Sequence, residues 1–275
     1  MSEGYVHGTS PEEQRRLGLM NDLVNEGSLR ELALAGGERI LEMGAGTGVF
    51  ARRMARAAGR SGRVVGIERS PAQLAAAEEL GRLAPGDVPV ELRLGDVLDP
   101  PLEPREWGSF DVVHARFLLE HLDDPVAAVR VMARAAKPGG RLVLEDDDHD
   151  VMRLWPEPTG FDAVWSAYQE SYRSMGRDPL IGRKLPGILH EAGVRPSRAS
   201  WIWFGACAGD PRLPVAVDNL CGVIAGAQDA ILATGRVDAA EVEALLADLR
   251  AWGGRPDASF GYAFPWVEGR TPART

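Results

Sequence analysis

Short apolar runs alternate with longer stretches of helical periodicity between residues 38 and 150. The apolar runs predict five strands, at 39–43, 63–67, 90–94, 110–114 and 141–145. Between the first two runs, Phe50, Met54 and Ala58 fall on one face of a helix that we expect over 47–58. Strands that alternate with helices in this way predict a parallel sheet covered by helices on both faces.

Beyond residue 150 this alternation stops. The pattern there predicts helices near 161–175 and 183–192, a strand at 201–204, helical periodicity over 212–251 and a last strand at 259–264. We therefore predict a doubly wound α/β fold with a mostly parallel, seven-stranded sheet. It has four parts: a helical N-terminal arm (1–37), a ligand-binding core (38–150), a helical insertion or lid (151–200) and the C-terminal part of the sheet with its helices (201–275).

The 275-residue chain is acidic, with 40 Asp plus Glu against 31 Lys plus Arg and a formal net charge of −9. This balance argues against a broad phosphate-binding surface, so we expect no nucleic-acid partner. No apolar leader opens the sequence, and no apolar run approaches the roughly 20 residues that span a bilayer. We therefore expect a cytoplasmic protein without a membrane partner. Cys207 and Cys221 show neither disulfide nor zinc-site spacing.

A glycine-rich loop at residues 44–48 carries the strongest chemical signal in the sequence. Gly44 and Gly46 allow a tight turn from strand to helix and a close approach of a ligand to the backbone. A dinucleotide site would place a third glycine at position 49, where the chain has Val49. Glu42, two residues before the loop, would repel a pyrophosphate and attract a cationic amine and sulfonium. An NAD-dependent oxidoreductase is therefore disfavoured.

Further motifs follow the loop in a definite order. Glu68 ends the second predicted strand, Gly95-Asp96-Val97 follows the third, and Phe110-Asp111-Val112-Val113-His114-Ala115 forms the fourth. In this order they resemble the class I S-adenosylmethionine-dependent methyltransferases of the small-molecule type, over about residues 40–150. The resemblance implies a Rossmann-like methyltransferase fold, with S-adenosyl-L-methionine as the cofactor bound by the 38–150 core.

The resemblance also implies roles for individual residues. Glu68 would accept hydrogen bonds from both ribose hydroxyls, with Arg69 beside it. Asp96 would contact the adenine amino group, and the backbone N–H of Val97 would contact the ring. Tyr5 of the arm would lie over the methionine end. The remaining residues expected to contact the cofactor are Glu42, Gly44, Ala45, Gly46 and Ala115.

A general base is needed where the acceptor must lose a proton, and His is the usual base near neutral pH. We predict His149, in the acidic run 145–150, as this base and His121 as the alternative. The run itself has three interpretations: a solvated acidic loop, the setting of the base, or oxygen ligands for Mg²⁺ or Ca²⁺. We assign no metal ligands. His114 ends the fourth strand at a position whose alternation is compatible with burial.

Aromatic residues over 161–172 form a stripe that is typical of a helix core and is also suited to roofing an apolar pocket. We predict that Trp165 and Tyr168, with Asp146, contact the acceptor. The predicted function is methyl transfer to a small, partly apolar acceptor, with oxygen favoured and nitrogen or carbon open. The alternative is a protein of the same fold that binds the cofactor but catalyses a cyclisation or isomerisation, or serves as a binding module. The helical arm is compatible with a homodimer.

Overall fold

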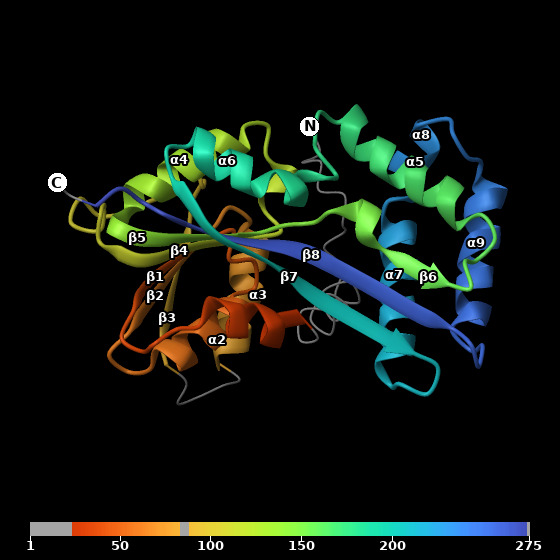
Figure 1. Cartoon of the computed structure of the whole chain (residues 1–275), viewed down its shortest axis with the longest axis horizontal. Coiled ribbons are helices and arrows are strands. Elements are labelled where there is room, and N and C mark those ends of the chain that lie inside the picture. The colour runs from red at the N-terminus through yellow and green to blue at the C-terminus, as the bar shows by residue number, and fades with distance from the viewer. Residues whose placement is uncertain (1–23, 83–87, 274–275) are drawn as a thin grey trace. The chain divides into compact units, whose positions relative to one another are not determined.

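The computed structural model describes residues 24–82 and 88–273 (Figure 1). Tyr5 and the rest of the predicted N-terminal arm before residue 24 lie outside the described residues. The described chain forms two compact units. Unit 1 comprises 24–26, 148–180 and 203–263, and unit 2 comprises 27–82, 88–147, 181–202 and 264–273.

The sheet is mostly parallel, and the described residues contribute eight strands in the order β3-β2-β1-β4-β5-β8-β6, with β7 paired to β8. Their bounds are β1 (Arg39–Met43), β2 (Arg63–Glu68), β3 (Val90–Leu94), β4 (Phe110–Arg116), β5 (Ala136–Glu145), β6 (Arg153–Trp155), β7 (Arg195–Cys207) and β8 (Ser259–Arg270). The prediction of seven strands is therefore wrong by one. The additional strand is β6, whose three residues are too few to show a period of two.

Pairing directions agree with the predicted doubly wound topology. The strands β1 to β5 form parallel pairs, whereas β8 runs antiparallel to β5 and β6. Because parallel strands end at the same edge of a sheet, the carboxyl ends of β1, β2, β3 and β4 come together there. This is the edge at which ligands bind in open α/β sheets.

Unit 2 has helices on both faces of its strands (Figure 1). Helices α4 (Pro125–Ala135) and α6 (Leu185–Glu191) lie on one side, with α2 (Val49–Ala58) and α3 (Pro71–Arg82) on the other. Residues 24–32 are also helical. Short 3-10 turns occupy Leu119–His121 and Ile181–Lys184. Asp124 caps α4 by accepting the N–H of Ala127 at 2.8 Å.

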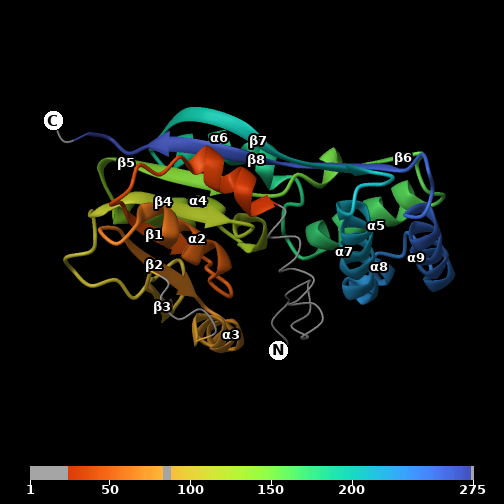
Figure 2. The same ribbon diagram turned by 90° about the horizontal axis from the view of Figure 1, so that it is seen from below.

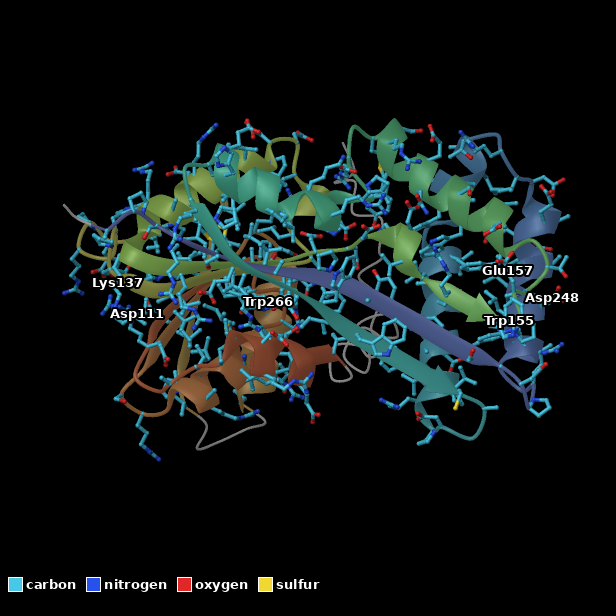
Figure 3. All side chains as sticks on the ribbon, viewed as in Figure 1. Asp111, Lys137, Trp155, Glu157, Asp248 and Trp266 are labelled. Carbon is cyan, nitrogen blue, oxygen red and sulfur yellow. The ribbon has the colours of Figure 1, made fainter. Side chains whose placement is uncertain are left out.

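The amino ends of three unit 2 strands are held together by Asp111. Its carboxylate accepts the backbone N–H of Arg39 at 2.8 Å, at the start of β1, and pairs with the Lys137 ammonium near the start of β5. Figure 3 shows Asp111 and Lys137 side by side, at the end of β4 away from the glycine loop. The aspartate of the Phe110–Ala115 motif therefore has a structural role.

Unit 1 contains most of the remaining helices: α5 (Phe161–Ser174), α7 (Arg212–Gly226), α8 (Gln228–Ala233) and α9 (Ala239–Trp252). In Figure 2 they gather beside one another, and α5 contacts α8 and α9 while α7 contacts α9. The helical periodicity predicted over 212–251 is thus divided into three helices, with a left-handed Gly235 between the last two. Asp238 begins α9 with a complete capping box. In the described part of the chain, no helix has the length and apolar character needed to cross a membrane.

Candidate functional site

The glycine loop joins β1 to α2 at the carboxyl edge of the sheet. Gly44, Gly46 and Gly48 have φ angles of 73°, 54° and 69°, which L side chains rarely adopt. A Cβ atom at position 44 would lie 3.0 Å from Leu118 Cδ1. The N–H groups of Gly44 and Ala45 both donate to the carbonyl of Ile67 at 2.9 Å, which ties the loop to β2. The sequence therefore requires glycine here for both conformation and space.

Glu68, the last residue of β2, connects the loop to its neighbours. One carboxylate oxygen accepts the N–H of Gly46 at 2.8 Å, and the other accepts the N–H of Ser70 at 2.8 Å. Its backbone carbonyl accepts the N–H of Gly95, directly after β3, at 2.9 Å. The Glu68 carboxylate thus lies within hydrogen-bonding reach of the loop backbone, between the ends of β1 and β3.

The other predicted cofactor residues occupy the same edge in unit 2. Asp96 is exposed just beyond β3, with Oδ1 accepting the N–H of Leu98 at 2.7 Å. Val97 is buried beside it, and Arg69 is exposed after β2. Ala115 is buried in β4 and pairs with Met43 of β1. The structure therefore brings the sequence motifs to one edge, while their roles stay predictions.

Glu42 has an unusual environment for an acid. Its side chain is only 5% exposed, and Oε1 lies 3.7 Å from Nδ1 of His114. Its other oxygen, Oε2, is buried and has no hydrogen-bond partner among the described residues. A buried carboxylate oxygen without a donor is costly, so this atom fits a site for a donor that arrives with a ligand. A cationic amine has the matching charge.

Glu42 lies next to a buried cluster of polar side chains that the sequence analysis did not predict. Nε2 of His114 lies 3.0 Å from Oε1 of Glu145, and the Ser28 hydroxyl donates to Oε2 of Glu145 at 2.5 Å. The Arg116 guanidinium lies 4.2 Å from the centre of the Phe50 ring. The spacing of His114 and Arg116, two apart in one strand, could have indicated a shared face. Nothing in the sequence pointed to Ser28.

His149, the predicted base, lies in unit 1 with both aromatic residues that we predicted to contact the acceptor. Its ring centroid is 5.6 Å from that of Trp165, 5.3 Å from Tyr168 and 5.4 Å from Tyr172. The Trp165 indole N–H donates to the backbone carbonyl of His149 at 2.8 Å. In contrast, Trp155 of β6 is 71% exposed (Figure 3). His149 therefore packs edge-on within an aromatic cluster on α5.

The acidic run 145–150 is mostly buried, so its interpretation as a solvated loop is wrong. Glu145, Asp146, Asp148 and His149 are each at most 5% exposed. Asp146 accepts the N–H groups of Leu118 and Leu119 at 3.2 and 2.7 Å. Burial, together with the nearby charges of Glu120 and Asp147, raises the pKa of Asp146 well above its ordinary value.

His121, the alternative base, lies in unit 2 in the 3-10 turn after β4. Its Nε2 is 3.5 Å from Oε1 of Glu120, and its side chain is largely buried. The geometry leaves His121 a candidate proton acceptor beside the cofactor edge.

Comparison with known proteins gives a consistent set of relatives. A family described as a methyltransferase domain matches residues 41–144. A 27-O-demethylrifamycin SV methyltransferase of Amycolatopsis mediterranei is 32% identical over 200 residues, covering 72% of this chain and 68% of that protein. A ubiquinone biosynthesis O-methyltransferase of Ralstonia nicotianae is 36% identical over 181 residues, covering 66% of this chain and 73% of that protein.

Another relative is matched over a smaller share of its length. An uncharacterized 37.1 kDa protein in a Streptomyces fradiae transposon is 33% identical over 159 residues, 57% of this chain. The chain spans only 43% of that protein.

Solved structures show the same fold. A proposed methyltransferase from Bacillus halodurans has a TM-score of 0.59 at 20% identity, covering 91% of this chain and 99% of that one. The (4+2)-cyclase SpnF has a TM-score of 0.54 at 22% identity, covering 93% of this chain and 80% of that one. At such identities the likeness concerns architecture alone.

Proposed function

Since the chain belongs to the class I S-adenosylmethionine-dependent methyltransferases, we propose that it transfers a methyl group to a small, partly apolar acceptor, with oxygen as the favoured acceptor atom. Two relatives with substantial coverage support oxygen, because their names describe a 27-O-demethylrifamycin methyltransferase and an O-methyltransferase of ubiquinone biosynthesis. The predicted intact cofactor site favours this function over a binding module.

The observation that carries the proposal is the unpartnered Oε2 atom of buried Glu42, at the start of the glycine loop. In the proposed arrangement this oxygen accepts from the amine of the methionine moiety. Glu68 accepts from the ribose hydroxyls in place of its present backbone donors, and Asp96 and Val97 contact the adenine. The left-handed glycines at 44 and 46 allow the ligand to approach the backbone.

The bound cofactor supplies an activated methyl group on a positively charged sulfur. The protein has to align the acceptor with that group, exclude water and, for an oxygen acceptor, remove a proton. We propose His149 for the proton transfer, with His121 as the alternative, and Asp146, Trp165 and Tyr168 as acceptor contacts. Closely packed aromatic rings around His149 support an apolar setting for this step.

Replacement of Glu68 tests the cofactor assignment. In Glu68→Ala we expect the affinity for S-adenosylhomocysteine, measured by calorimetry, to fall about tenfold or more, because charged hydrogen bonds to the ribose are lost. Glu79→Ala, an exposed acid on α3, is the matched control and should change the affinity less than about twofold.

Two results would contradict the proposal. One is tighter binding of NAD than of S-adenosylhomocysteine by the unaltered protein. The other is the absence of transfer from a labelled methyl donor to any member of a panel of small phenolic and hydroxylated acceptors, despite cofactor binding.

A further inference from the structure

A stripe of ionisable side chains lies buried on one face of the sheet in unit 2. Glu42 of β1 is in register with His114 of β4, and Arg116 of β4 is in register with Glu145 of β5. Residues in register on parallel strands, and residues two apart in one strand, share a face of the sheet. His114 is fully buried, and Glu42 and Glu145 are nearly so. Each of these charges loses hydration, so the stripe needs a compensating arrangement of charge.

His114 is the member of the stripe that meets both carboxylates. Its Nε2 is 3.0 Å from Glu145 Oε1, and its Nδ1 is 3.7 Å from Glu42 Oε1. Burial alone would lower the pKa of His114, but the hydrogen bond to Glu145 and the interactions with Glu42 outweigh this effect and raise the pKa above its ordinary value. A proton on the imidazole places a positive charge between the two flanking acids in the protein interior.

The side chains packed around the imidazole show why His114 is the group that pairs with Glu42. Phe50 of α2 packs on the imidazole with ring centroids 5.1 Å apart, which excludes water from that side. Ser28 lies beside Glu145, donating to its Oε2 and standing 3.5 Å from the Arg116 guanidinium. Arg116 interacts favourably with both acids and unfavourably with Arg53 of α2. His114 is the base that stands at ion-pair distance from Glu42.

We propose that His114 is a positioning residue of the cofactor site: as an imidazolium between Glu145 and Glu42, it compensates the charge of the Glu42 carboxylate and directs Oε2 toward the amine of the methionine moiety. This inference rests on the proposed function, because it assigns a second residue to the same amine subsite. His114 acts through Glu42 and does not itself contact the ligand. Without the imidazolium, the buried Glu42 carboxylate would lose the positive neighbour that stands 3.7 Å from its Oε1 and orients the group.

The test compares two ligands that differ in the amino-acid moiety. S-adenosylhomocysteine has this moiety, and 5′-methylthioadenosine lacks it but retains the adenosine. We expect His114→Phe and His114→Gln to lower the affinity for S-adenosylhomocysteine about tenfold near pH 6. The difference from the unaltered protein should shrink as the pH rises, because the unaltered protein then loses the proton of His114 as well. Binding of 5′-methylthioadenosine should stay within about twofold at every pH, since it makes no use of Glu42.

The outcomes separate a positioning role from a structural one. A structural role would lower the affinities for both ligands alike. A loss of S-adenosylhomocysteine affinity that is equal at all pH values would overturn the inference. The charge of His114 in the unaltered protein is measured independently, from the nitrogen shifts of its labelled imidazole, and a neutral ring near pH 6 would also overturn it. Failure of the unaltered protein to bind S-adenosylhomocysteine would instead overturn the proposed function. An unchanged preference between the two ligands in both variants would overturn this inference alone.

Discussion

Asp146 illustrates how a single acid can be both required and costly. It is fully buried at the end of β5, where it accepts the N–H groups of Leu118 and Leu119 that begin the turn after β4. Its pKa is raised by burial and by the charges of Glu120 and Asp147. A group with a raised pKa contributes its full stability below the pKa of the unfolded chain, and that contribution is lost as the pH rises through the folded pKa. Asp146 therefore favours the folded state in acid and opposes it when ionised.

Asp146→Asn tests this account, since the amide keeps an acceptor for the backbone and cannot ionise. We expect the free energy of unfolding of the variant, relative to the unaltered protein, to increase as the pH rises from about 4 to about 8. Urea denaturation at a series of pH values measures it. Asp146→Ala leaves both N–H groups without their acceptor and should cost about 1–3 kcal/mol at acidic pH. A difference between Asn and Asp that does not vary with pH would contradict the interpretation.

The local sequence pattern predicts the positions of residues near the glycine loop far better than it predicts contacts between residues distant in the sequence. Glu42 and Glu68 stand at strand ends next to recognisable turns, so their position at the edge follows from the alternation of strands and helices. The hydrogen bond between Ser28 and Glu145 joins residues 117 positions apart. Its formation depends on how a helix packs on the sheet, which no local pattern encodes. The burial of the acidic run was missed for the same reason.

At the scale of secondary structure, long periodic segments were predicted and short or irregular ones were not. The strands β1 to β4 and the helices α2 and α5 lie close to their predicted positions. The three-residue β6 was missed because it exists through antiparallel pairing with residues 259–261 of β8. The strand β7 extends well beyond the predicted 201–204, because it begins in a polar stretch, 195–200, that lacks the apolar signal of a strand.

The glycine loop offers a comparison between two glycines with similar positive φ angles. Gly44 has φ 73° and Gly59, after α2, has φ 71°. A Cβ atom at 44 would meet Leu118, whereas one at 59 would meet nothing within 4 Å. We expect Gly44→Ala and Gly59→Ala each to lower the free energy of unfolding by about 1 kcal/mol or more, through left-handed strain. Only Gly44→Ala should also lower the affinity for S-adenosylhomocysteine, by about tenfold.

Thermal unfolding and calorimetry on the two glycine variants check both parts of this expectation. An equal loss of affinity for S-adenosylhomocysteine in Gly59→Ala would show that the effect comes from lost stability and not from the loop itself. Unchanged cofactor affinity in Gly44→Ala would remove the loop from the proposed site.

At the scale of the whole molecule, the predicted site residues fall into two groups. Those assigned to the cofactor and described by the structure belong to unit 2, as do His121 and Asp146, whereas His149, Trp165 and Tyr168 belong to unit 1. The sequence indicated this division only indirectly, through the loss of alternation after residue 150. Unit 1 also includes residues 203–263, which no pattern in the sequence associates with α5. Such associations arise from long-range packing.

The division leads to a prediction for His149. In His149→Gln we expect the turnover number to fall about a hundredfold with an oxygen acceptor, because proton removal is lost, while cofactor affinity changes less than about twofold. The acidic limb of the pH–rate profile should flatten as well. Steady-state kinetics and calorimetry measure the two effects, and the same measurements on His121→Gln test the alternative base. Full turnover with an unchanged pH profile would exclude His149 as the base.

The position of β8 in the chain has a consequence for biosynthesis. Residues 266–270 of β8 pair with β5, and residues 259–261 pair with β6, although both partners are made much earlier during translation. Until β8 leaves the ribosome, β5 keeps an open backbone edge of the kind that pairs with other chains. The nascent protein is therefore exposed to misassembly from the emergence of β5 until β8 follows. Changes that slow translation just before residue 259 should reduce the yield of native protein even when they alter no amino acid.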